Sequence, residues 1–114
     1  MSLLAAAGIN MSSIKIRTNR VAGKTQIRIL IAHPMENGLN RNTKTNELIP
    51  AHFIQLLTVK YNEEVIVTCN MDARISKDPY FAFMLKGGNA GDKISISWTD
   101  NLGNKDAQDH IIGM

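Results

Sequence analysis

Hydrophobic and polar residues alternate along most of this chain with a period of two, and the period of an amphipathic helix is almost absent. Residues 27–31 carry isoleucine at every second position, and residues 94–98 alternate isoleucine or tryptophan with serine. Such alternation places apolar side chains on one face of a strand and polar ones on the other. The pattern therefore predicts a chain of half-buried β-strands.

Seven such segments follow one another, separated by turn-forming residues such as Gly87–Asp92. The expected strands cover residues 14–17, 25–33, 52–60, 65–71, 80–86, 94–99 and 105–112. Short strands with turns at regular intervals are typical of an all-β fold, the immunoglobulin-like antiparallel β-sandwich. We expect its core to contain Ile27, Ile29, Ile31, Val65, Val67, Phe81, Phe83, Ile94, Ile96 and Trp98.

The 114 residues are enough for one domain with a core of its own. Residues 1–11 are small and apolar and precede the first alternating segment, so we expect a disordered N-terminal extension whose first ten residues can be deleted without effect. Residues 12–114 form the predicted sandwich domain.

Charge narrows the classes of partner. The net charge is +3, and the first sixty residues are richer in basic than in acidic side chains. Lys15, Arg17 and Arg28 alternate with apolar residues, which favours a solvated face over an anion-binding one. Basic runs interleaved with aromatics are absent, so nucleic-acid binding is not expected. A membrane span is not expected either, because no apolar run reaches about 18 residues.

The residues of the chain do not form a catalytic motif. No nucleophile elbow, phosphate-binding loop or zinc-protease motif occurs, so we expect neither enzyme activity nor a cofactor. The single cysteine, Cys69, shares its strand phase with apolar residues, which favours an inert packed thiol over a reactive one. The chain order His33, Cys69, His110, Met114 imitates a cupredoxin, but blue-copper ligands need closer spacing, and copper binding stays the less favoured alternative.

A long connection follows the second expected strand. It covers residues 34–51. It follows His33, the last residue of the expected strand, and its first residue, Pro34, ends that strand. Loops of this length in small domains are commonly functional or mobile. The pattern supports a capped strand end and a recognition loop equally.

Four blocks of sequence stand out beside the alternation. They are His33-Pro34-Met35-Glu36-Asn37-Gly38-Leu39, Ile49-Pro50-Ala51-His52-Phe53-Ile54, Ile75-Ser76-Lys77-Asp78-Pro79-Tyr80-Phe81-Ala82-Phe83, and Gly91-Asp92-Lys93-Ile94 with Trp98-Thr99-Asp100-Asn101-Leu102-Gly103. Together these blocks resemble the SoxZ family of bacterial thiosulfate oxidation. Their order and approximate spacing agree with the family over about residues 14–105. Asn37 and Asp78 depart mildly from it, since threonine and asparagine are common there.

The resemblance implies a non-catalytic subunit of a heterodimeric sulfur carrier. SoxZ-like proteins pair with SoxY, whose C-terminal cysteine carries sulfur intermediates between the enzymes of thiosulfate oxidation. This chain ends in His110-Ile111-Ile112-Gly113-Met114, without such a cysteine. The resemblance also implies a periplasmic location, reached by export together with SoxY. A generic β-sandwich binding module remains the alternative.

Several expected strands carry apolar residues on both faces, whereas a two-layer sandwich buries only one face of each sheet. A partner is therefore expected to cover the second face, although the 34–51 loop could do so instead. The residues expected to bind the partner are His33, Pro34, Met35, Phe53, Leu57, Ile66, Tyr80 and Met84.

Overall fold

A computed structural model describes residues 12–113 and confirms the all-β fold. The expectations for residues 1–11 lie outside the described residues. The seven strands are β1 (Ile14–Val21), β2 (Lys24–Ile31), β3 (Ile54–Tyr61), β4 (Glu64–Asn70), β5 (Tyr80–Lys86), β6 (Lys93–Asp100) and β7 (Lys105–Ile111). No helix of the described residues is long and apolar enough to cross a membrane.

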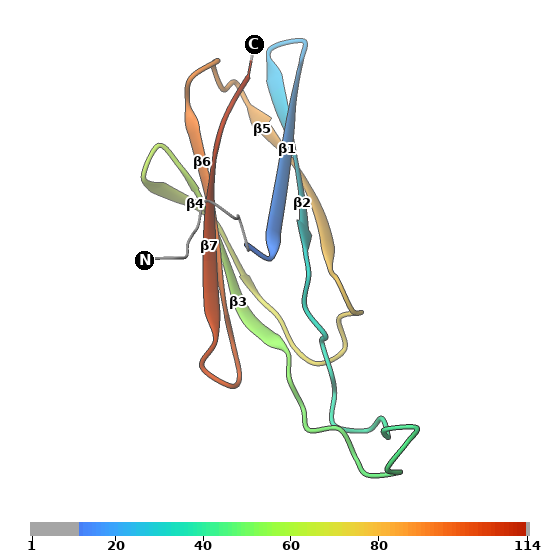
Figure 1. Cartoon of the computed structure of the whole chain (residues 1–114). Coiled ribbons are helices and arrows are strands. Elements are labelled where there is room, and N and C mark those ends of the chain that lie inside the picture. Colours follow the sequence, from blue (N-terminus) through green and yellow to red (C-terminus); the bar gives the residue numbers. More distant parts are fainter. Residues whose placement is uncertain (1–11, 114) are drawn as a thin grey trace, which may run out of the picture.

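The strands form two antiparallel sheets packed face to face (Figure 1). One sheet has the order β1-β2-β5 and the other the order β4-β3-β6-β7. The connections after β2, β4 and β5 cross from one sheet to the other. This arrangement agrees with the immunoglobulin-like sandwich that the alternation predicts.

Tight hairpins join neighbouring strands within each sheet. Ala22 and Gly23 link β1 to β2 with φ angles of 50° and 79°, and Asn62 and Glu63 link β3 to β4 with φ angles of 47° and 74°. Two consecutive positive φ angles are the signature of the turn that matches the twist of paired strands. Gly88 is required for lack of space: a Cβ atom at this position would lie 2.5 Å from Thr25 Oγ1, so no larger residue fits without a shift.

The core lies between the sheets and is centred on β2, β3 and β6. Its buried hydrophobic residues are Ile14, Ile27, Ile29, Ile31, Met35, Ile54, Leu57, Val59, Ile94, Ile96, Trp98 and Ile112. The expected core positions on β2 and β6 are therefore confirmed. Those on the edge strands differ, since Val67, Phe81 and Phe83 are only half-buried.

The prediction that Val65 belongs to the core is wrong, because its side chain is 52% exposed. The cause is a β-bulge opposite Val59 and Lys60, where Val59 pairs with Val67 but Lys60 pairs with Val65. Ile66 is the extra residue of the bulge. The bulge reverses the phase of β4, so Val65 follows the exposed Lys60 outward.

The two long sides of the sandwich differ. At one side β1 and β7 approach each other closely, so the two sheets meet in a seam. At the other side lie the edge strands β4 and β5, whose inward-facing Val67, Phe81 and Phe83 are half-exposed. The sandwich is thus closed along the β1–β7 seam and open along the β4–β5 side, which we call the open edge.

Candidate partner-binding surface

An apolar groove runs along the open edge. It has a volume of about 250 Å³. Its lining comes from both sheets and consists of Ile27, Val59, Ile66, Val67, Phe83, Met84, Leu85 and Lys86. All of these except Lys86 are apolar, and together they form a path from solvent to the core. A groove of this kind can receive apolar side chains of a protein partner.

The groove continues onto the outer face of β5. Tyr80 and Met84 point outward there and are 59% and 57% exposed. Leu30 of β2 lies directly opposite Tyr80 in the sheet and is 42% exposed. Because Met84 also lines the groove, the open edge and this strip form one apolar surface.

The structure separates the eight expected partner-binding residues into three groups: exposed, buried and half-buried. Pro34, Ile66, Tyr80 and Met84 are exposed, and their role in partner binding stays a prediction. Placing His33, Met35 and Leu57 on the surface was wrong, because they are 3%, 6% and 0% exposed and pack inside the chain. Phe53 is half-buried against the core.

These corrections have a simple physical reason. Strand β3 has apolar residues on both faces, and alternation does not show which set faces inward. Leu57 lies between Cys69 of β4 and Trp98 of β6, in the central region of its sheet, so its side chain fills the core. Met35 has a φ angle of 48°, which turns its side chain inward next to Ile54.

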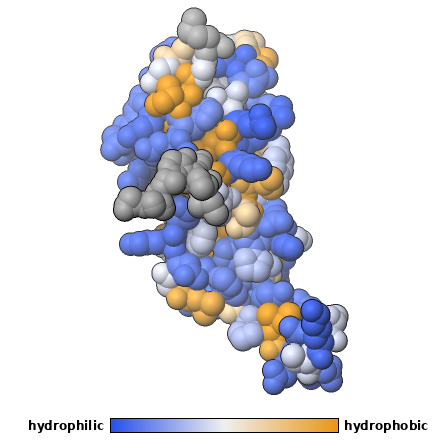
Figure 2. Space-filling model, viewed as in Figure 1, coloured by the Kyte–Doolittle hydropathy of each residue, from blue (hydrophilic) through white to orange (hydrophobic). Residues whose placement is uncertain are grey.

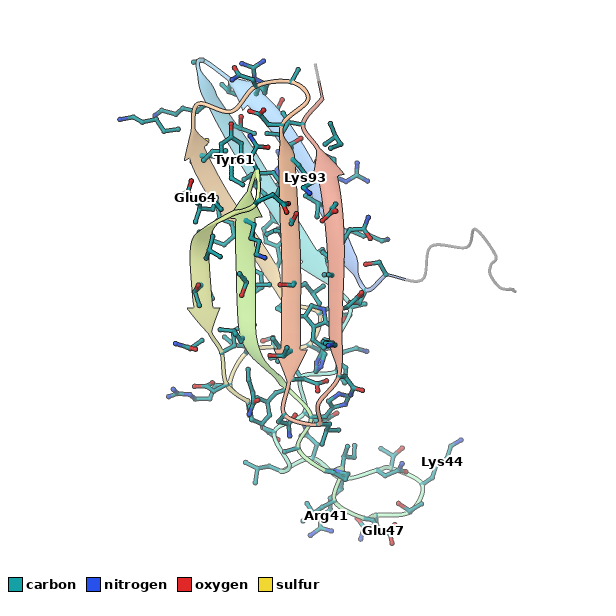
Figure 3. The ribbon with its side chains drawn as sticks, turned by 90° about the vertical axis from the view of Figure 1, so that its left-hand side faces the viewer. Arg41, Lys44, Glu47, Tyr61, Glu64 and Lys93 are labelled. Carbon is teal, nitrogen blue, oxygen red and sulfur yellow. The ribbon has the colours of Figure 1, made fainter. Side chains whose placement is uncertain are left out.

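The connection between β2 and β3 does not fold over the open edge. It projects beyond the end of the sandwich as an arm, residues 34–53 (Figures 1 and 3). Bridges between Glu36 and His52 and between Arg41 and Leu48 pair the two legs of the arm. Leu39 and Leu48 are 79% and 54% exposed, and hydrophobic atoms are visible on the arm in Figure 2. The alternative that this loop covers the second apolar face is therefore wrong.

A buried hydrogen-bonding hub holds the base of the arm. Asp100, at the end of β6, is 4% exposed. Its Oδ2 atom lies 3.1 Å from His33 Nε2 and 2.7 Å from His52 Nε2. The Asn104 side chain also donates to Oδ2, while the backbone N–H groups of Leu102 and Asn104 donate to Oδ1. One carboxylate thus joins both legs of the arm to the β6–β7 turn.

The hub also controls the ionisation of Asp100. Burial raises the pKa of its carboxyl group, because a charge is poorly solvated there. The hydrogen bonds from His33, Asn104 and His52 favour the charged form and prevail, so the pKa of Asp100 lies well below its usual value. Asp100 is therefore a carboxylate in the folded protein at neutral pH.

Two histidines and a carboxylate within 4.8 Å of one another also resemble a metal-ligand set. The hydrogen bonds favour another role. The Met35 N–H donates to His33 Nδ1 at 3.1 Å, so a neutral His33 carries its proton on Nε2, the atom that faces Asp100. A protonated nitrogen donates a hydrogen bond and has no lone pair for a metal ion. This geometry supports a structural hub.

The cupredoxin-like alternative also fails on geometry. Cys69 and His110 lie on β4 and β7, the opposite edges of the four-stranded sheet, with two strands between them. At about 4.8 Å per strand they are at least roughly 14 Å apart, and the register offsets them further along the strands, since Cys69 lies in the row of Asp106 and not of His110. His33 hydrogen-bonds Asp100, His110 hydrogen-bonds Thr18, and Met114 lies outside the described residues. The described candidates do not converge on one ion.

Cys69→Ser is expected to lower the free energy of unfolding by less than about 1.5 kcal/mol and to leave partner binding unchanged. The thiol is half-buried and packs against the core beside Leu57, where it acts as a small apolar group. Urea unfolding and a binding titration measure the two quantities. Loss of binding in a folded variant would contradict the inert assignment.

Sequence reasoning singled out His33 but missed its partners His52 and Asp100. Two histidines next to strand ends, with an aspartate that begins a turn, were the available signal. Such a signal is weak, because 67 residues separate His33 from Asp100 along the chain.

Comparison with protein families matches residues 14–110 to the family described as sulphur oxidation protein SoxZ. A search of curated proteins finds no match.

Proposed function

The chain belongs to the SoxZ family of sulphur oxidation proteins. We propose that it is the non-catalytic partner of a SoxY-like subunit in a heterodimeric sulfur carrier, and that it binds the SoxY-like subunit along its open edge. The observation that carries the proposal is the groove between β4 and β5, where core-facing apolar side chains remain half-exposed. A partner that fills the groove removes this apolar surface from water, which favours binding.

The edge strands add a second attraction. Each of β4 and β5 has one neighbour in its sheet, so one side of its backbone is unpaired within the described residues. Edge strands of this kind are recognised by partner segments that pair with them. The SoxY-like subunit would carry the reactive cysteine, and this chain would supply a rigid platform for it. Residence in the periplasm, by export with that subunit, is part of the same proposal.

The test is complex formation with the co-expressed SoxY-like subunit. Replacing Ile66 and Met84 together by lysine is expected to weaken binding at least about tenfold, because two charges would enter an apolar interface. Isothermal titration gives the dissociation constants, and circular dichroism confirms folding.

The matched control places two lysines on exposed apolar positions at the other side of the four-stranded sheet. Leu102 and Ile111 are 57% and 56% exposed, on the β6–β7 turn and on β7. The Leu102→Lys/Ile111→Lys variant is expected to bind the subunit as the wild type does. Equal weakening by both variants would refute the open edge as the binding site, and no complex with the wild type would refute the partnership.

A further inference from the structure

The outer face of the β1-β2-β5 sheet has an unusual charge composition. The register places its outward residues in four rows across the three strands. The rows are Lys15-Leu30-Tyr80, Arg17-Arg28-Ala82, Asn19-Gln26-Met84 and Val21-Lys24-Lys86. These twelve positions hold five cations and not one carboxylate. We call this surface the cationic face; in Figure 1 it is the outward side of the β1, β2 and β5 layer.

Two of the rows place like charges directly opposite each other. Arg17 faces Arg28, and Lys24 faces Lys86. Like charges at paired positions of a sheet destabilise it. A local arrangement that costs stability without a gain within the chain is often explained by function.

The chain does little to neutralise these cations. None of the ion pairs among residues 12–113 includes any of the five. The Arg28 guanidinium instead donates to the neutral Gln26, at 3.1 Å from Nη2 to Oε1. Two carboxylates lie at the rim of the face. Asp109 lines the β1–β7 seam with Lys15 and Arg17, and Asp78, which accepts the His33 N–H, shares a small depression with Lys15.

The cations also surround apolar side chains. Lys15, Arg17 and Arg28 line a depression of about 350 Å³ together with Leu30 and Tyr80. From these charges and this apolar centre we infer that the cationic face is a second interaction surface, which binds an acidic protein surface with apolar residues at its middle. The inference goes beyond the proposed function, because the groove of the open edge holds none of Lys15, Arg17 and Arg28; the two surfaces adjoin at Met84 and Lys86, which belong to both.

The dimensions favour a protein over a small anion. Three strands span about 10 Å, and residues 24–30 of β2 span about 20 Å. A single sulfate-sized ion can contact only one or two of the five cations, whereas an extended acidic surface can face all of them. The exposed Leu30 and Met84 favour a protein over a nucleic-acid backbone, because their side chains have no donor for phosphate oxygens.

The test uses two synthetic peptides of about eight residues, long enough to span roughly 26 Å as a strand. One alternates glutamate with leucine, and the other alternates lysine with leucine. We expect the complex with the SoxY-like subunit to bind only the acidic peptide, with affinity that falls as NaCl is raised from about 0.02 to 0.2 M.

The Lys15→Glu/Arg17→Glu variant is expected to weaken acidic-peptide binding at least about tenfold. This variant should still fold, because the glutamate that replaces Arg17 would pair with Arg28 of the neighbouring strand as an opposite charge. Its melting temperature should therefore not fall below that of the wild type. The control variant Lys77→Glu/Lys105→Glu changes the net charge equally at exposed positions outside the face, and it should bind like the wild type.

Equal weakening by both variants, or tighter binding of duplex DNA than of the acidic peptide, would overturn the inference. The SoxY-like subunit provides the last measurement. If Lys15→Glu/Arg17→Glu weakens binding of the SoxY-like subunit by the same factor as binding of the acidic peptide, then the acidic partner is the SoxY-like subunit itself. That result overturns a second surface while leaving the proposed partnership intact. Failure of the Ile66→Lys/Met84→Lys variant to affect the subunit would refute the open edge as its binding site, and it would leave the acidic-peptide comparison of Lys15→Glu/Arg17→Glu with its control unchanged.

Discussion

Replacing Asp100 by asparagine is expected to lower the free energy of unfolding by about 3–5 kcal/mol. The Oδ2 atom accepts hydrogen bonds from His33, His52 and the Asn104 side chain in a site that water does not reach. An amide cannot replace this carboxylate, because its NH₂ group donates and would face groups that also donate. Rotating the amide only moves the conflict to the backbone N–H groups at Oδ1.

His33 cannot adapt to the substitution. Its Nδ1 atom already accepts the Met35 N–H, so its Nε2–H must remain a donor without an acceptor. The arm should loosen as a result, since His33 and His52 connect its two legs to β6. Faster hydrogen exchange at the backbone N–H groups of Glu36 and His52, which pair across the arm, would report this directly.

The acid dependence of stability offers an independent measurement. The folded-state pKa of Asp100 is lowered, so its contribution is fully present above the unfolded value of about 3.9 and is lost as the pH falls toward the folded value. The wild type should lose this stability progressively below about pH 4, and Asp100→Asn should lack that component. Urea midpoints measured from about pH 2 to about pH 7 would show it.

The matched control for Asp100 is Asp109→Asn. Asp109 is exposed on β7, and the same change of charge there should alter stability by no more than about 0.5 kcal/mol. Equal stability of the two variants would contradict the hub as a main support of the arm.

Trp98→Ala is the second large effect, an expected loss of about 3–5 kcal/mol that can unfold the domain. Trp98 lies on β6 at the centre of the four-stranded sheet and is 7% exposed. Its ring packs edge-on against His33 with centroids 5.1 Å apart. Removing the ring leaves a cavity between the sheets and withdraws packing from the hub.

The indole also closes the β1–β7 seam. Its Nε1–H donates to Ser13 Oγ at 3.0 Å, and that hydroxyl donates to Asp106 Oδ2 at 2.7 Å. Trp98→Phe keeps most of the packing but removes the donor, so it should cost less than half of the alanine effect, about 1–2 kcal/mol. Thermal unfolding of both variants tests the order. A phenylalanine variant as unstable as alanine would assign the effect to the hydrogen bond and not to packing.

The alternation of residues decided most of the fold. Each segment's period is a local property, because side chains of a strand point to opposite faces whatever the strand pairs with. Seven strands followed from it, and Tyr80–Lys86 has the predicted bounds. For the central strands β2 and β6 the alternation also predicted correctly which face points inward, since only one face of each strand is strongly apolar.

The candidate site depended on contacts that no local pattern contains. Strand β3 is apolar on both faces, so the burial of Leu57 was decided by its neighbours in the sheet. The bulge at Ile66 reversed the phase of β4, and it arises from pairing with β3 rather than from the sequence of β4 alone. Alternation identified Tyr80 and Met84 as outward residues but not the groove beside them.

By itself the sequence determined the number of strands, the antiparallel sandwich and the family resemblance, because strand periodicity and motif order are properties of the linear chain. Only the tertiary structure decided which edge stays open, how His33, His52 and Asp100 meet, and that five cations share one face. Each of these depends on residues far apart in the chain being brought together by strand order and register, which pairing between strands sets.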